Sequence, residues 1–135
     1  MSATATLAAP AATDTARLLI IDDEPSIRES LETLLTLEGF DVTLAPDGVK
    51  GIDILSRDEF DLLLLDVKVG GHLGQMILET LRRHDLLLDT AVILVADRRD
   101  ASVEDVAEAI GAVHIHEKRA PYEDLLPALY ALLDT

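Results

Sequence analysis

Residues 61–71 read DLLLLDVKVGG: four consecutive leucines end at one carboxylate, Asp66, just before a turn that contains glycine. Leucine runs of this kind belong in the protein interior, where an unpaired carboxylate is costly. We therefore place Asp66 at the carboxyl end of a buried strand, where the chain leaves the core. In an open parallel sheet, that edge is where ligands bind.

The chain alternates between strand-like and helix-like segments from Arg17 onward. Short apolar runs predict five strands, at residues 17–21, 41–45, 61–66, 91–96 and 112–117. Apolar residues at helical spacing predict five helices, over 24–39, over 47–59, around Leu73, Ile77 and Leu81, around Val103, Val106, Ala107 and Ile110, and from Leu125 to Leu133 with Pro127 near the start. This alternation predicts an α/β fold: a doubly wound five-stranded parallel sheet of order 2-1-3-4-5, in a flavodoxin-like three-layer sandwich.

The composition fits one domain with an aliphatic core. Of the 135 residues, 49% are hydrophobic and 3% aromatic, and the absence of cysteine excludes disulfides and thiolate metal sites. The formal net charge of -15 disfavours direct binding to nucleic acid, and no apolar run approaches the ~20 residues of a membrane span. We expect a flexible tail over residues 1–16, a domain over residues 17–134 and a cytoplasmic protein.

Three carboxylates are predicted to meet at one edge of this sheet. Asp22 and Asp23 follow the first strand, and Asp66 ends the third, which is its neighbour in the predicted order. Clustered carboxylates repel one another, and a hard divalent cation such as Mg²⁺ removes that penalty. Asp66 is then a candidate nucleophile that forms an aspartyl phosphate, and Lys118, after the fifth strand, is a candidate cation for the phosphoryl group.

Each of these residues also has an ordinary structural interpretation. Paired acids after a strand often cap a helix, and Asp23 or Glu24 before Pro25 would favour a helix N-terminus. An aspartate that ends a leucine run is often a turn residue, and a lysine after a strand usually faces solvent. The functional interpretation gains weight because all of these residues fall on one edge of one sheet.

Three segments resemble the receiver domain of bacterial two-component response regulators. Residues 18–48, LLIIDDEPSIRESLETLLTLEGFDVTLAPDG, are similar to the opening of that family. Residues 60–74, FDLLLLDVKVGGHLG, are similar to its phosphoacceptor segment, and residues 111–118, GAVHIHEK, to its lysine segment. The resemblance covers about residues 17–134, with the motifs in order and on the expected elements.

The resemblance implies a role for each matching residue. Asp66 accepts a phosphoryl group from a histidine kinase. Asp23 binds Mg²⁺ directly, Asp22 contributes through water, and the backbone carbonyl of Lys68 completes the metal site. Lys118 contacts the phosphoryl group.

Four positions depart from the family pattern. Ala96 stands where a Thr or Ser usually bonds the phosphoryl group, and Ile115 stands where a Tyr or Phe usually changes rotamer with that hydroxyl. Arg119 and Gly70 occupy positions where proline is usual, and a cis bond before Arg119 costs ~3 kcal/mol. We expect a domain that is phosphorylated but does not switch through the hydroxyl and aromatic pair.

Several basic residues near the predicted site have open roles. Lys68 and Arg98 are candidates to replace the missing hydroxyl, although exposed loop positions explain them equally well. His114 and His116 share one face of the last strand, and we expect them to lie at the surface or against a helix rather than to bind metal. His72 follows the phosphoacceptor loop and is given no role.

The leading functional hypothesis is a signalling receiver that catalyses only its own phosphotransfer and dephosphorylation. Its partners would be a sensor histidine kinase or phosphotransfer protein, and then a downstream protein or a missing C-terminal output domain. A homodimer through the last helix–strand–helix face is possible, without membrane or direct nucleic-acid binding. One alternative is a degenerate receiver that acts as a phosphorylation-independent binding module. An aspartate-nucleophile phosphatase is disfavoured, because the DDEP segment does not match the nucleophile pattern of those families.

Overall fold

The computed structural model describes residues 15–68 and 74–133. In this part of the chain, five strands form one sheet with every neighbouring pair parallel. The strands are β2 (Arg17–Ile21), β3 (Asp41–Ala45), β4 (Leu62–Asp66), β5 (Ala91–Ala96) and β6 (His114–Glu117), in the spatial order β3-β2-β4-β5-β6. This is the predicted 2-1-3-4-5 arrangement, so the fold prediction is confirmed.

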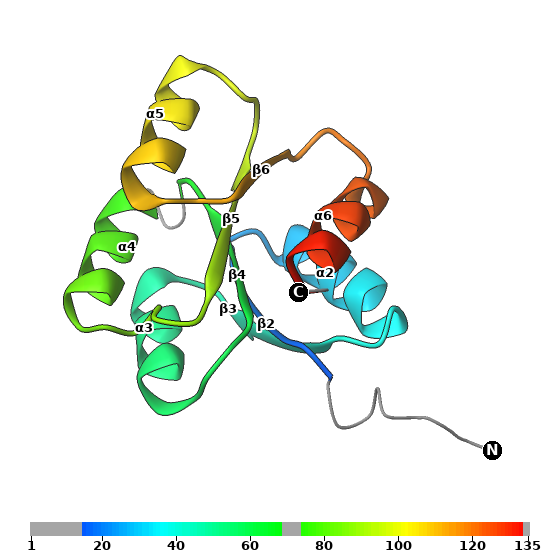
Figure 1. The fold of residues 1–135 in the computed structure, drawn as a ribbon. Helices are drawn as coiled ribbons and strands as arrows, with labels where there is room; N and C mark the ends of the chain where they lie inside the picture. The colour runs from blue at the N-terminus through cyan, green and yellow to red at the C-terminus, as the bar shows by residue number, and fades with distance from the viewer. Residues whose placement is uncertain (1–14, 69–73, 134–135) are drawn as a thin grey trace.

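Helices cover both faces of the sheet and complete a three-layer sandwich (Figure 1). The α-helices are α2 (Pro25–Leu37), α3 (Gly48–Arg57), α4 (Gly74–Arg83), α5 (Ala101–Ile110) and α6 (Leu125–Leu133), and the 3-10 turn η2 (Tyr122–Asp124) leads into α6. Figure 1 shows α2 and α6 on one face and α3, α4 and α5 on the other. No helix within residues 15–68 and 74–133 has the length and apolar character needed to cross a membrane.

The leucine run in β4 is buried because both faces of its strand are covered. Leu63 and Leu65 belong to the core beneath α3, α4 and α5, and Leu62 and Leu64 belong to the core beneath α2 and α6. All four side chains are fully buried. Side chains of a strand alternate between faces, so a run without polar interruption marks a strand enclosed on both sides.

Local sequence signals account for several helix boundaries. The carboxylates of Asp47 and Asp100 accept hydrogen bonds from the backbone N–H groups of Lys50 and Val103, and so cap α3 and α5. Helix α5 ends at Gly111, whose φ of 74° lies in the left-handed region. These helices hold their flanking loops at the carboxyl edge of the sheet, beside the candidate site.

Some predicted boundaries differ from the structure. The last strand begins at His114 rather than at residue 112, because the chain leaves α5 through the left-handed Gly111. Pro127 lies in the first turn of α6, where its missing N–H group costs no helical hydrogen bond. Gly70, His72, Leu73 and residues 1–14 of the expected tail lie outside the described residues.

Candidate functional site

Strand pairing brings the predicted carboxylates together at the carboxyl edge of the sheet. Ile21 of β2 pairs with Leu65 of β4, so the next residues, Asp22 and Asp66, leave the sheet side by side. Asp22, Asp23, Glu24 and Asp66 each offer a carboxylate oxygen, and these oxygens lie within 4.8 Å of one another. The predicted convergence is therefore present, with Glu24 as an additional member.

The four carboxylates differ in burial. Asp22 is 1% exposed and Asp66 is 4% exposed, whereas Asp23 and Glu24 are exposed. Asp23, Glu24 and Asp66 border a pocket of about 450 Å³, whose other lining residues are Val67, Lys68, Asp97, Asp100, Ser102, Val103 and Lys118. A small charged group entering this pocket would meet Asp66 at a buried wall and Asp23 and Glu24 at the rim.

Lys118 holds the buried and the exposed carboxylates through one ammonium group. Its Nζ lies 3.0 Å from Oδ2 of Asp66, 2.6 Å from Oε1 of Glu24 and 3.8 Å from Oδ2 of Asp22. The backbone N–H of Lys118 donates to the carbonyl of Ala96 at 2.7 Å, which fixes the loop after β6 against β5. The placement of Lys118 agrees with the sequence analysis.

Glu24 is the part of the cluster that the sequence analysis did not assign to the site. It was considered only as a residue that favours the start of a helix, and it does occupy the N-cap position of α2. Its side chain makes no capping hydrogen bond and turns instead to Lys118. The two residues are 94 positions apart, so no local pattern could have identified the pair.

Backbone hydrogen bonds orient both buried carboxylates. The N–H of Glu24 donates to Oδ1 of Asp22 at 2.9 Å, and the N–H of Lys68 donates to Oδ1 of Asp66 at 3.2 Å. Arg28 of α2 donates from its guanidinium to the backbone carbonyl of Asp22 at 2.8 Å. These bonds fix the loops after β2 and β4 around the pocket.

The electrostatics of the site reflect crowded negative charge. Burial raises the pKa of the Asp22 carboxyl from 3.8 to about 6, with a further rise from Asp66, although the backbone bond from Glu24 and the charge of Lys118 oppose this. Burial alone would lower the pKa of Lys118, but its bonds to Glu24 and Asp66 raise it well above its ordinary value. Lys118 is therefore a permanent cation, and Asp22 loses its proton with difficulty.

The donor set fits a hard divalent cation. All four groups are carboxylates, and their oxygens lie close enough together to contact one ion. Mg²⁺ commonly uses one or two carboxylates together with water and phosphate oxygens. Asp22, Asp23 and Asp66 are the residues suited to hold it.

Two of the four positions that depart from the family pattern, Ala96 and Ile115, lie in an apolar cluster next to the pocket. Ala96 is 1% exposed and packs with Val67 and Val103, and Ile115 packs against the same group. No peptide bond in the described ranges is cis, so Arg119 follows Lys118 through a trans bond. The side chains at positions 96 and 115 offer no hydrogen-bonding group to a phosphoryl oxygen.

The remaining basic candidates occupy different surroundings. Lys68 lines the pocket, whereas Arg98 is not among its described lining residues. His116 is 3% exposed and packs against the ring of Tyr122, in agreement with the expectation of a residue that packs against helical structure. His114 is half-buried on the same strand.

Comparison with known proteins places these features in one family. The family model described as the response regulator receiver domain matches residues 18–130. The response regulator MprA of Mycobacterium avium is 37% identical over 118 residues, which are 87% of this chain and 50% of MprA. The chain thus spans about half the length of its MprA relatives.

Solved structures show the same architecture. A CheY-like receiver domain protein from Methanospirillum hungatei matches with a TM-score of 0.80 and 28% identity, over 89% of this chain and 94% of that one. The response regulator TrrA of Thermotoga maritima, solved in complex with Mg(2+)-BeF, matches with a TM-score of 0.75 and 25% identity, over 87% of this chain and 99% of that one.

Proposed function

The chain belongs to the response regulator receiver family, and from this premise we propose that Asp66 accepts a phosphoryl group from a sensor histidine kinase or a phosphotransfer protein. The observation that carries the proposal is the 3.0 Å contact between Asp66 and Lys118 inside a cluster of four carboxylates. A buried carboxylate held by an ammonium group and open to a pocket has the surroundings of an acceptor.

The transfer would use one oxygen of Asp66 as the nucleophile. That oxygen forms a bond to phosphorus while the bond from phosphorus to the donor histidine nitrogen breaks, and the nitrogen keeps the electron pair. Oδ2 is held by Lys118 at 3.0 Å, and Oδ1 accepts a longer bond of 3.2 Å from the N–H of Lys68. Oδ1 is therefore the oxygen that is released more easily for attack.

Negative charge must be compensated before a phosphoryl group can enter this pocket. Asp22, Asp23, Asp66 and the backbone carbonyl of Lys68 would hold Mg²⁺, which when bound supplies charge neutralisation between the carboxylates and the phosphoryl oxygens. Lys118 would then exchange part of its contact with Asp66 for a charge-assisted hydrogen bond to the phosphoryl group. The Mg(2+)-BeF complex of TrrA supports this assignment by analogy.

The proposed receiver lacks the hydroxyl and aromatic pair through which the family usually switches. Ala96 and Ile115 pack together in an apolar cluster, so a phosphoryl group finds no hydroxyl at the end of β5 to pull inward. We expect phosphate capture to be kept, and coupling through the hydroxyl and aromatic pair to be lost.

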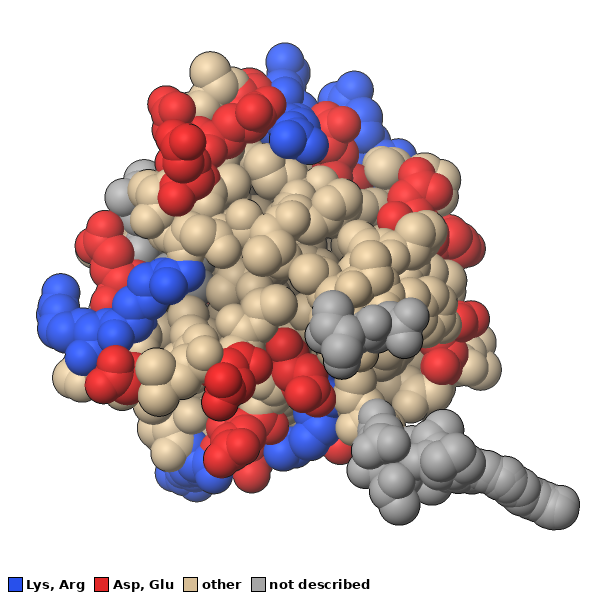
Figure 2. Space-filling model, in the orientation of Figure 1, with Lys and Arg blue, Asp and Glu red and all other residues tan. Residues whose placement is uncertain are grey.

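The partner that receives the signal is proposed only by its kind. The signal would pass to a downstream protein partner or to a C-terminal output domain of the kind that would account for the greater length of MprA. Figure 2 shows few charged side chains on the face between α5 and α6, which is compatible with a homodimer through α5, β6 and α6. We further propose a cytoplasmic domain of residues 17–134. It would bind no nucleic acid directly and catalyse only its own phosphotransfer and dephosphorylation.

A second candidate function is a phosphorylation-independent binding module. The apolar surroundings of Ala96 and Ile115 favour it, because they remove the usual link between the site and the surface. The intact carboxylate cluster and its lysine contact favour a working acceptor. Titration with Mg²⁺ separates the two, since a module that has lost phosphorylation is under no pressure to keep the cation.

The decisive experiment is mass spectrometry after incubation with Mg²⁺ and a small phosphodonor such as acetyl phosphate. We expect a mass increase of one phosphoryl group, located on Asp66 by peptide mapping and lost in Asp66→Asn. Asp97→Asn is the matched control, because Asp97 lines the same pocket but lies outside the carboxylate cluster. An unmodified protein, or modification of another residue, would reject the proposal.

The expected lack of conventional switching needs a separate measurement. Amide NMR spectra with and without Mg²⁺ and beryllofluoride should show small changes around Ala96 and Ile115 compared with an ordinary receiver. Large displacements of β5 and β6 would reject this part of the proposal and leave the phosphorylation result unaffected.

A further inference from the structure

His116, on the face of β6 opposite Ile115, packs its ring against the ring of Tyr122 in η2. His116 is 3% exposed, and its Nε2 is a buried side-chain atom with no hydrogen-bond partner among the described residues. The ring of His116 lies 5.5 Å from the ring of Tyr122, with an angle of 37° between the planes. A buried polar atom without a partner is costly, so its retention here calls for an explanation.

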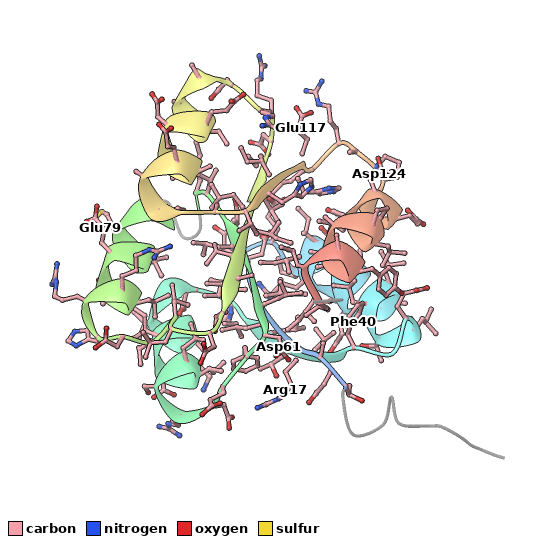
Figure 3. All side chains as sticks on the ribbon, in the orientation of Figure 1. Arg17, Phe40, Asp61, Glu79, Glu117 and Asp124 are labelled. Atoms are coloured by element: carbon pink, nitrogen blue, oxygen red, sulfur yellow. The ribbon has the colours of Figure 1, made fainter. Side chains whose placement is uncertain are left out.

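Tyr122 connects three parts of the domain. It is the first residue of η2, which leads directly into α6, and η2 also lies against α2. Its side chain packs on the core that contains Leu125 and Leu129 of α6. Only three residues separate Tyr122 from Lys118, so a movement of the lysine loop is transmitted through a short segment of chain (Figure 3, between Glu117 and Asp124).

The charges of the acid pocket act on the Tyr122 hydroxyl. Burial raises the pKa of this phenol, the negative charges of Asp22 and Glu24 raise it further, and the positive charge of Lys118 lowers it. These are the groups whose charge or position must change when a cation and a phosphoryl group enter. Tyr130 is different, because the hydrogen bond to Glu38 dominates the rise in its pKa.

We propose that Tyr122, braced by the buried ring of His116, relays the charge state of the acid pocket to the start of α6. This rests on the proposed function, since the charge that it reads is that of the phosphorylation site. Positions 96 and 115 cannot respond through hydrogen bonds, whereas Tyr122 follows Lys118 after only three residues and has its ring against His116 of β6. The unpartnered Nε2 of His116 is an acceptor or donor on the ring that packs against Tyr122.

The composition allows a direct test. The chain has two tyrosines and no tryptophan, so Tyr130→Phe leaves Tyr122 as the only tyrosine, and Tyr122→Phe leaves Tyr130. Tyrosine ring NMR signals and fluorescence are recorded in each variant while Mg²⁺ alone, and then Mg²⁺ with beryllofluoride, is added. We expect the Tyr122 signals to shift at both steps and the Tyr130 signals to stay unchanged.

The relay is tested through the amides of α6. In the parent protein we expect Leu125 to Leu129 to shift with Mg²⁺ and beryllofluoride, and in Tyr122→Phe we expect this response to be lost, although the ring is kept. Phosphorylation of Asp66, followed by mass, should persist in Tyr122→Phe. His116→Phe keeps a ring against Tyr122 without the unpartnered nitrogen, and we expect a reduced α6 response.

The outcomes separate this inference from the proposed function. A mass increase on Asp66 with unmoved Tyr122 signals, or with a full α6 response in Tyr122→Phe, overturns the relay alone. Absence of the mass increase overturns the proposed function, and if the Tyr122 signals also ignore Mg²⁺, the relay is overturned with it. If Mg²⁺ shifts the Tyr122 signals but Asp66 is never phosphorylated, Tyr122 responds to the charge of the pocket, and only the proposed phosphorylation is overturned.

Discussion

Glu24 Oε1 lies 2.6 Å from the Nζ of Lys118, closer than Oδ2 of Asp66 at 3.0 Å. The lysine is thus shared between the exposed carboxylate of the residue that precedes α2 and a buried carboxylate at the end of β4. Its own side chain is 12% exposed, so water screens these contacts only in part. Lys118 is the ammonium group in contact with the carboxylate cluster, and any metal ion that enters must share the carboxylates with it.

Removal of this lysine should strengthen cation binding and weaken phosphorylation. In Lys118→Met the carboxylates lose their positive partner, and the repulsion between the ammonium and an incoming ion disappears. A unit charge at contact distance is worth a few kcal/mol near a protein surface, so we expect Mg²⁺ affinity to rise by at least about tenfold. Isothermal titration calorimetry measures this change.

The matched control for that variant is a lysine outside the pocket. Lys50 on α3 is exposed, and Lys50→Met should leave Mg²⁺ affinity within about twofold, because exposed charges are screened by salt. Unchanged or weaker Mg²⁺ binding in Lys118→Met would contradict the view that Lys118 competes with the ion. Phosphorylation of Asp66 in this variant should fall strongly, since no other described side chain pairs with its carboxylate through an ammonium group.

Glu24→Gln should separate the two halves of the shared contact. Because Glu24 is half-exposed, loss of its charge should change the free energy of unfolding by less than about 1 kcal/mol. The lysine then keeps only the two buried partners, Asp66 and the more distant Asp22, so we expect slower phosphorylation as well as weaker Mg²⁺ binding. Chemical denaturation and the initial rate of mass increase test both effects, and a destabilisation above about 2 kcal/mol would show that Glu24 has a structural role instead.

The raised pKa of Asp22 predicts a pH dependence of stability in the absence of divalent cations. An acid with a higher pKa in the folded state binds its proton more tightly there, so protonation stabilises the fold. The contribution of Asp22 to the free energy of unfolding is therefore greatest below pH 3.8 and falls as the pH rises through about 6. Asp22→Asn should remove this slope and be more stable than the parent at pH 7.

Two comparisons isolate this effect from general charge repulsion. Asp23→Asn removes a charge from the exposed neighbour and should keep the Asp22 slope. Mg²⁺ at pH 7 should recover stability in the parent more than in Asp22→Asn, because a ligand that binds only the folded state stabilises it. Equal slopes in the parent and Asp22→Asn between pH 4 and 7 would contradict the prediction.

The sequence contained enough to predict the sheet and the main residues of the site. The uninterrupted leucines of β4 require burial on both faces, and burial on both faces requires a parallel sheet between helices. In the doubly wound strand order, the first and third strands are neighbours, so Asp22 and Asp66 must lie side by side where these strands end. These inferences depend on local patterns and on general rules of topology, which a single sequence can supply.

The remaining features depend on contacts between distant residues. The pairing of Glu24 with Lys118 and the contact of His116 with Tyr122 arise from side-chain directions that no local spacing encodes. The last strand begins at His114, two residues later than its apolar pattern predicts, because the chain first turns at the left-handed Gly111. Gly51 is another example: the sequence alone indicates that a glycine weakens helix α3, but it does not show which side chain packs against that glycine.

Gly51→Ala tests a packing requirement that helix propensity alone would predict wrongly. By propensity, alanine should stabilise α3 by about 1 kcal/mol. A Cβ at position 51, however, would lie 2.3 Å from Cδ1 and 2.9 Å from Cγ1 of Ile21, which is fully buried in β2. Overpacking of this kind costs about 1–3 kcal/mol, so we expect a net loss of stability in chemical denaturation.

The control is the double variant Gly51→Ala with Ile21→Val, in which Cδ1 of residue 21 is absent. Adding Gly51→Ala to Ile21→Val should cost much less stability than adding it to the parent protein. A single Gly51→Ala variant that is more stable than the parent would show that β2 and α3 separate easily, and that this helix does not hold the strand that leads into Asp22.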